Sequence, residues 1–196
     1  MNSSIQLKRR FAVAASLCRG ALVLYCFGLC SSLQAVTPAP DGAYAGGNTA
    51  EGTNALFNLT SGVWNTALGH QSLYHVTTGN QNTATGYQTL FNTTTGSLST
   101  ANGAQALYNN TTGNDNVATG FRTLYSNTAG SSNTGNGFEV LSKNTAGFLN
   151  TANGWKALYS NTTGVQNTAE GVQALYNNTT GNSNTANGDF ALFSNT

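Results

Sequence analysis

Apolar and polar positions recur along this chain with a fixed spacing of 17 residues, from Asn48 to Thr196. The recurring unit is N-T-A-x-G-x-x-A-L-Y-x-N-T-T-G-x-x, so its apolar positions are Ala at position 3 and a short group at positions 8 to 10. Nine units follow one another without an insertion. A fixed period of this kind is typical of stacked repeats, in which each coil buries its apolar side against its neighbours.

The unit predicts extended structure and not helix. Its Ala, Leu and aromatic positions are adjacent, so no apolar stripe with the spacing i, i+3, i+4, i+7 exists. Asn, Thr and Gly are also poor residues for a helix interior. Glycines at positions 5 and 15 suit two bends per coil, with two strands of about five residues between them. We therefore expect an all-β parallel β-solenoid, or β-roll, of nine 17-residue coils.

Three positions are the same in every unit, Gly at position 5, Leu at position 9 and Thr at position 13, and the first two define the expected architecture. The bends are assigned to the position 5 glycines, namely Gly52, Gly69, Gly86, Gly103, Gly120, Gly137, Gly154, Gly171 and Gly188. The core is assigned to the position 9 leucines, namely Leu56, Leu73, Leu90, Leu107, Leu124, Leu141, Leu158, Leu175 and Leu192. Ala at position 3 should point into the same slim interior, and Asn at positions 1 and 12 should form amide ladders between coils.

Position 10 is aromatic in every unit but one, where Ser142 replaces the ring. Because neighbours in a strand point to opposite faces, we expect these rings to point outward if Leu points inward. An exposed apolar strip of that length favours packing against another copy or a ligand. The alternative is a bend that places both side chains inside the coil. The residues are Phe57, Tyr74, Phe91, Tyr108, Tyr125, Tyr159, Tyr176 and Phe193.

The first 35 residues have the pattern of a secretory signal peptide. Lys8-Arg9-Arg10 precedes an apolar run, Ala21 to Leu29, and Ala35 offers a small residue for cleavage. A retained membrane anchor is the alternative, although Arg19 interrupts the apolar stretch. We divide the chain into the signal peptide (1–35), a short linker (36–47) and the repeat domain (48–196). All three cysteines lie within the signal peptide, so the repeat domain has no disulfide or cysteine metal site.

Charge is sparse, and its distribution excludes several classes of function. Only 7% of the residues are charged, against roughly 25% in an ordinary domain. From residue 36 onward the basic residues are Arg122, Lys143 and Lys156, so no clustered basic face for nucleic acid is expected. His70 and His75 are interpreted as isolated surface residues, and no phosphate-binding glycine motif occurs. We expect no enzymatic activity, no catalytic residue, no cofactor and no metal.

The motif N-T-A-x-G-x-x-A-L occurs as Asn82–Leu90 and as Asn150–Leu158. It resembles the head repeats of trimeric autotransporter adhesins, the YadA-type head, and is also similar to tail-fibre-like secreted bacterial repeat proteins. The resemblance covers residues 48–196. It implies a left-handed β-roll that assembles as a homotrimer and binds a host surface or matrix. It also implies an exported bacterial protein, extracellular or on the outer cell surface.

These observations together favour a non-catalytic, adhesin-like structural module that mediates attachment or assembly. The variable positions 6 and 7, as in Phe121-Arg122 and Trp155-Lys156, would then diversify recognition. The alternative is a solenoid that binds a glycan or, less favoured, ice through its aromatic and Thr ladders. A paired T-x-T pattern for ice occurs only at Thr83–Thr85 and Thr93–Thr95. We expect no nucleic-acid partner, and no membrane span apart from the signal segment.

Overall fold

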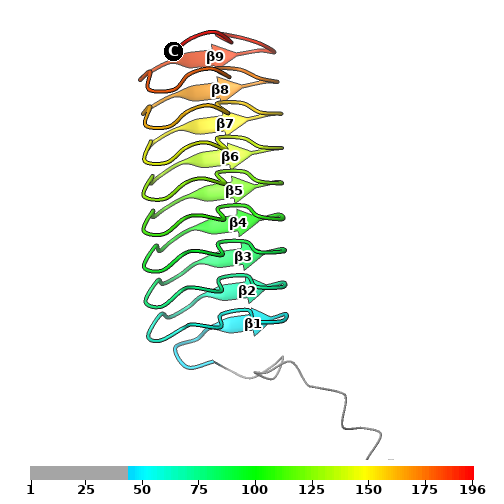
Figure 1. The fold of residues 1–196 in the computed structure, drawn as a ribbon, viewed down its shortest axis with the longest axis vertical. Helices are drawn as coiled ribbons and strands as arrows, with labels where there is room; N and C mark the ends of the chain where they lie inside the picture. The colour runs from blue at the N-terminus through cyan, green and yellow to red at the C-terminus, as the bar shows by residue number, and fades with distance from the viewer. Residues whose placement is uncertain (1–43) are drawn as a thin grey trace, which may run out of the picture. The chain divides into compact units, whose positions relative to one another are not determined.

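The computed structural model describes residues 44–196, so the predicted signal peptide and most of the predicted linker lie outside the described residues. These residues form a parallel β-solenoid with one strand per coil (Figure 1). The nine strands make a single sheet in chain order. We number the coils after the strands that they contain. The strands are β1 (Thr49–Glu51), β2 (Thr66–Leu68), β3 (Thr83–Thr85), β4 (Thr100–Asn102), β5 (Val117–Thr119), β6 (Thr134–Asn136), β7 (Thr151–Asn153), β8 (Thr168–Glu170) and β9 (Thr185–Asn187).

Each strand covers positions 2 to 4 of its unit, and the strands pair in a register of 17 residues. Thr49 pairs with Thr66 and Ala50 with Ala67, and the same register continues to β9. The middle residue of each strand is buried, whereas the residues beside it are exposed or half-buried. This is the period-two alternation of a strand with one face on the core. Ala at position 3 is small enough to let the opposite side of the coil approach.

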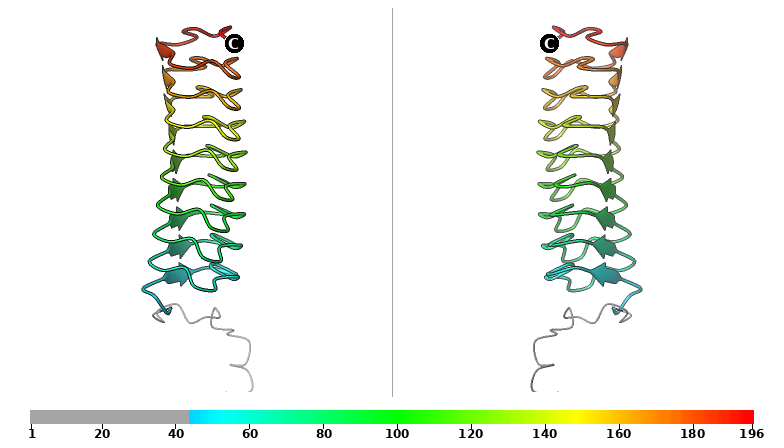
Figure 2. Two further views of the ribbon diagram at one scale, coloured as in Figure 1. Left: turned by 90° about the vertical axis from the view of Figure 1, so that its left-hand side faces the viewer. Right: turned by 90° about the vertical axis from the view of Figure 1, so that its right-hand side faces the viewer.

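The return side of each coil is not a strand, so the prediction of two strands per coil is wrong. Figure 2 shows the strands stacked on one side of the solenoid and an irregular backbone on the other. Every position 9 leucine has a φ between 49° and 54°, which is the left-handed region. Positions 7 and 17 are left-handed as well. An extended strand needs negative φ throughout, so these alternating residues interrupt it.

Hydrogen bonds between coils nevertheless continue along the return side. The amide of Leu73 donates to the carbonyl of Thr89 one coil further on, at 3.0 Å, and the amide of His75 donates to Phe91 at 3.1 Å. A left-handed φ is unfavourable for a bulky residue such as Leu. In coils 1 to 8 the left-handed Leu donates its amide to the next coil and buries its side chain. The 17-residue recurrence therefore predicted the parallel β-solenoid, whereas strand alternation predicted the wrong backbone for the return side of each coil.

The leucines form the centre of the core. Leu73, Leu90, Leu107, Leu124, Leu141, Leu158 and Leu175 are fully buried, and Leu56 is nearly so. Leu192 differs, because it lies in coil 9 and is 48% exposed with no described coil stacked above it. Position 3 alanines complete the same cluster. The interior is thus a narrow column of Leu and Ala whose burial depends on the stacking of neighbouring coils.

Two buried asparagine ladders lie beside this column, and the expectation of amide ladders at positions 1 and 12 is confirmed. In the position 12 ladder, Nδ2 of Asn127 donates to Oδ1 of Asn110 at 2.8 Å, and Asn144 continues the row. In the position 1 ladder, Nδ2 of Asn133 donates to Oδ1 of Asn116 at 3.2 Å. Buried amides are costly unless paired. Repetition satisfies them, because each coil offers its neighbour the complementary atom.

The two ladders meet at the position 15 glycines of coils 5 to 8. The carbonyl of Gly130 accepts Nδ2 of Asn116 and Nδ2 of Asn127, both at 2.8 Å. This glycine has no left-handed φ; instead, a Cβ on it would overlap Oδ1 of Asn127 and the backbone of the next coil. The position 5 glycines do have positive φ, between 119° and 131°. The two glycines of the unit therefore serve different purposes, close approach at position 15 and backbone conformation at position 5.

Candidate binding surface

The aromatic residues of position 10 form a continuous stack along the solenoid, which we call the aromatic ladder. Consecutive rings from Phe57 to Tyr125 lie with centroids 5.1 to 5.2 Å apart and with nearly parallel planes. The stack resumes with Tyr159, Tyr176 and Phe193, again at 5.2 Å. Such spacings are favourable for aromatic pairs. Phe57 is 61% exposed, and the other rings are half-buried, since each ring covers the faces of its neighbours.

A second row of rings comes from position 6, directly after the bend glycine. His70 stacks on Tyr87, with centroids 5.6 Å apart. Further along, Phe121 stacks on Phe138 at 5.3 Å, and Phe138 stacks on Trp155 at 6.4 Å. Phe121, Phe138 and Trp155 are each about 40% exposed. One of the two variable positions singled out in the sequence, position 6, thus forms an apolar surface over coils 5 to 7.

Two basic side chains, Arg122 and Lys156, lie between these two rows. The guanidinium of Arg122 is 5.0 Å from the ring centroid of Phe121 and 5.3 Å from that of Tyr125. Nζ of Lys156 is 4.7 Å from Trp155 and 5.2 Å from Tyr159. These are cation–π distances, so the cations are held against the rings. Rows 6, 7 and 10 therefore make up one face of the solenoid.

One ion pair links coils 6 and 7 on this face. Nζ of Lys156 lies 3.2 Å from Oε2 of Glu139, and both side chains are partly exposed. An exposed pair of this kind contributes little to stability. Its effect is on the local charge, because Glu139 offsets one of the nearby cations. Within residues 44–196, no group of three or more His, Cys, Asp or Glu side chains could hold a metal ion.

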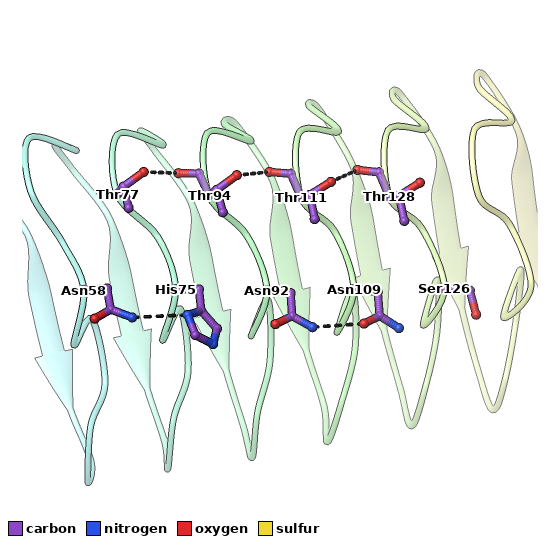
Figure 3. Close-up of a pocket in the computed structure, with 9 residues that line it drawn as sticks. All are labelled: Asn58, His75, Thr77, Asn92, Thr94, Asn109, Thr111, Ser126 and Thr128. Carbon is purple, nitrogen blue, oxygen red and sulfur yellow. Dashed lines mark hydrogen bonds between the residues drawn. The ribbon is translucent and has the colours of Figure 1, made fainter.

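An open groove of about 740 Å³ runs over coils 1 to 5 (Figure 3). Its lining residues closely follow the aromatic position 10 in each unit. Two rows of polar residues line it, from positions 11 and 13. In the position 13 row, each Thr hydroxyl donates to the backbone carbonyl of the next Thr, as from Thr111 to Thr128 at 3.0 Å. The lining residues are Asn58, His75, Thr77, Asn92, Thr94, Asn109, Thr111, Ser126 and Thr128.

The position 11 row is only partly hydrogen-bonded within the described chain. Nδ2 of Asn58 donates to Nδ1 of His75 at 3.2 Å, and Nδ2 of Asn92 donates to Oδ1 of Asn109 at 3.0 Å (Figure 3). His75 also packs edge-on against Tyr74 and Phe91. His75 is therefore a supporting residue of the ladder and the groove, which its isolation in the sequence did not reveal. The groove presents amide and hydroxyl groups at a regular interval.

The face of the β-sheet presents a different surface. Position 2 supplies a row of Thr side chains, interrupted only by Val117, whereas position 4 varies from Glu to Leu and Asn. Thr83 and Thr85 therefore share the outer face of β3, but neighbouring strands do not repeat the pair. In the other T-x-T segment, Thr93 is fully buried and points away from any such face. The paired Thr surface needed for ice is thus confined to single coils.

Glu51 and Glu170 occupy the same position in β1 and β8, seven coils apart. They are not brought together. Among residues 44–196, the structure has no helix long and apolar enough to cross a bilayer. Comparison with protein-family models, with curated proteins and with solved structures finds no match to this chain.

Proposed function

We propose that this chain is a non-catalytic, adhesin-like structural repeat module that is exported and mediates attachment or assembly at the cell surface. The observation that carries the proposal is the aromatic face formed by positions 6, 7 and 10. Its stacked rings are partly exposed and run along the solenoid from coil 1 to coil 9, with one gap in the position 10 row at Ser142. Stacked rings with fixed orientation offer large contact area at low entropic cost, as binding surfaces require. The resemblance to trimeric adhesin heads supports the same proposal.

The attachment can be tested with beads that carry the chain and with surfaces coated with matrix proteins or glycans. We expect retention to fall when the exposed rings of coils 5 to 7 are removed together, in the variant Phe121→Ser/Phe138→Ser/Trp155→Ser. A matched variant, Val117→Ser, removes an exposed apolar side chain from the outer face of β5 and should leave retention unchanged. Equal retention of the parent and the triple variant would argue against this face as the attachment surface.

We further propose that copies assemble as a homotrimer through the corner formed by positions 16 and 17. Trp64, Leu98 and Leu149 are 50% to 64% exposed there and have no aromatic stack to cover them. Large apolar side chains left this exposed favour burial against another chain. Rings inside the ladder, such as Tyr74 and Phe91, are already covered on both faces by their neighbours. We therefore propose the contact between copies at positions 16 and 17 and not at the ladder, where the sequence predicted it.

Light scattering and cysteine crosslinking test the assembly. Residues 36–196 contain no cysteine, so Leu98→Cys and Tyr125→Cys are clean single probes of the two surfaces. We expect a mass of three chains, and oxidative crosslinks at Leu98→Cys but not at Tyr125→Cys. A monomer in solution would overturn the trimer, and crosslinks only through Tyr125→Cys would return the contact to the ladder.

A glycan ligand is the second candidate, and the groove of Figure 3 favours it. Within the described chain, Nδ2 of Asn109 and the hydroxyl of Ser126 make no hydrogen bond. Amides and hydroxyls beside aromatic rings are the groups that sugar hydroxyls and sugar faces contact. A glycan array tests this with the parent chain and with Asn109→Ala. Loss of the bound signal in the variant would support glycan binding in the groove, and equal signals would exclude it.

A further inference from the structure

The aromatic ladder has one interruption, in coil 6. Ser142 stands where the other coils have a ring, between Tyr125 of coil 5 and Tyr159 of coil 7. Adjacent rings of the ladder are 5.2 Å apart, so these two flanking rings are about 10 Å apart, which leaves the space of one aromatic ring between them. Position 6 has no such interruption here, because Phe121, Phe138 and Trp155 stack through the same three coils.

All the basic side chains of residues 44–196 surround this interruption. Arg122 lies against Tyr125, and Lys143 lies 4.9 Å from the ring centroid of Tyr159. Lys156 also contacts Tyr159, at 5.2 Å. One carboxylate, Glu139, is paired with Lys156. The other acidic residues of this part of the chain, Glu51, Asp115, Glu170 and Asp189, lie in coils 1, 4, 8 and 9. The interruption is therefore the one place where the described chain is locally positive.

Ser142 itself is only 8% exposed, so neighbouring side chains cover it. Arg122 and Lys143 are the long side chains that lie over the two flanking rings. Both have flexible aliphatic stems at the surface, which can rotate away without a change in the backbone. Their cationic groups would then stand at the rim of the space instead of within it.

We propose that this interruption is a binding site for a planar aromatic ring that carries an acidic group. The ring would complete the ladder by stacking between Tyr125 and Tyr159, while its negative group would meet Arg122 and Lys143. Both halves of the ligand are required: stacking alone would recruit a neutral ring equally well, and charge alone would recruit any small anion. The site lies within the face formed by positions 6, 7 and 10, at coil 6, but the binding of a small ligand there does not require attachment through that face.

The experiment uses the full chain and three probes: naphthalene-2-sulfonate, neutral naphthalene-2-methanol, and methanesulfonate, which has charge but no ring. Binding is followed by calorimetry and by the NMR signals of the probe. We expect naphthalene-2-sulfonate to bind at least about tenfold more tightly than either control, since a tenfold difference corresponds to about 1.4 kcal/mol, the size of one stacking or cation contact. Equal binding of the neutral probe would overturn the role of the cations.

Two variants locate the site. Ser142→Tyr restores the ring of the other coils, so it should keep the fold and abolish binding. Arg122→Gln/Lys143→Gln keeps the space and removes the charge, and we expect at least about a tenfold loss. In the Ser142→Tyr background, Phe91→Ser opens a matched space between Tyr74 and Tyr108, where no Lys or Arg lies in coils 2 to 4. Binding that survives Ser142→Tyr, or that Phe91→Ser restores in full, would overturn the proposal.

Discussion

Gly135 and Val140 share one space inside coil 6. A Cβ on Gly135 would lie 3.3 Å from Cγ1 of Val140 and 2.7 Å from Cγ2 of Thr123 in coil 5. Every other coil has Ala at position 3 and a smaller residue than Val at position 8. A close-packed interior conserves volume locally, so the missing methyl at one position accommodates the larger side chain at the other.

This relationship predicts a non-additive pair of substitutions. Gly135→Ala alone should lower the free energy of unfolding by about 1–3 kcal/mol through overpacking. Gly135→Ala combined with Val140→Ala should recover most of the loss, because coil 4 already packs Ala101 and Ala106 next to Thr89 of coil 3. Urea unfolding of both variants measures the coupling. Additive losses in the double variant would contradict the shared space.

The bend glycines predict a contrast between the middle and the end of the solenoid. Gly120 and Gly188 have the same φ of 119°, but a Cβ on Gly120 would overlap the carbonyl oxygen of Gly137, whereas a Cβ on Gly188 meets nothing. Gly188→Ala should therefore cost only the conformational strain, and Gly120→Ala about 1–3 kcal/mol more. Thermal melts of the two variants give the comparison. Equal losses would mean that the positive φ, and not the close contact between coils, is the reason why this position requires glycine.

The position 12 ladder predicts that removing one of its polar side chains greatly lowers the free energy of unfolding. Asn127→Ala removes the donor to Asn110 and the acceptor of Asn144. Each buried group left unpaired costs about 1–3 kcal/mol, so we expect a total loss of at least about 2 kcal/mol. Asn102→Ala is the matched control, because Asn102 lies exposed on β4 and should change stability by less than about 0.5 kcal/mol. Similar denaturation midpoints for the two variants would contradict a structural role of the ladder.

Thr93 occupies position 12 of coil 3, and there we expect removal of the polar group to raise stability. Its hydroxyl is buried and has no hydrogen-bond partner within residues 44–196. Thr93→Val keeps the shape and removes the unpaired group, so stability should rise by up to about 1 kcal/mol. Thr123→Val is the control, since the hydroxyl of Thr123 donates to the carbonyl of Gly137 at 2.6 Å, and this variant should be destabilised. Calorimetric melting temperatures that fall in both variants would show that the Thr93 hydroxyl is satisfied.

Tyr108 predicts a loss of stability at high pH. Burial within the ladder, followed by the nearby Tyr125 and Tyr87, raises its pKa above the ordinary value of 10.0. The folded state then holds the phenolic proton more tightly than the unfolded state, so this contribution is complete below pH 10.0 and is lost as the pH rises through the folded pKa. Tyr108→Phe should match the parent at pH 7 and lose less stability at alkaline pH. Parallel pH profiles of melting temperature would contradict this assignment.

The sequence by itself determined the period, the direction of stacking and the residues of the core. Recurrence every 17 residues placed Leu, Ala and Asn in rows, and rows of identical residues can bury or pair only with their own copies in adjacent coils. The amide ladders and the buried leucines were predictable for that reason. The three basic residues and the missing ring of Ser142 were also visible in the sequence, but only as departures from a consensus.

The tertiary structure decided the backbone conformation of the return side. It also decided where the residues that depart from the repeat consensus lie in space. No local signal marks Leu124 or Arg122 as left-handed, because a bulky residue adopts that conformation only where contacts between coils impose it. The structure likewise decided that positions 6, 7 and 10 share one face, and that Lys143 at position 11 reaches a ring of that face, so Arg122, Lys143 and Lys156 surround the same gap. A linear pattern gives the order of side chains along a coil, whereas their directions follow from φ angles that stacking alone selects.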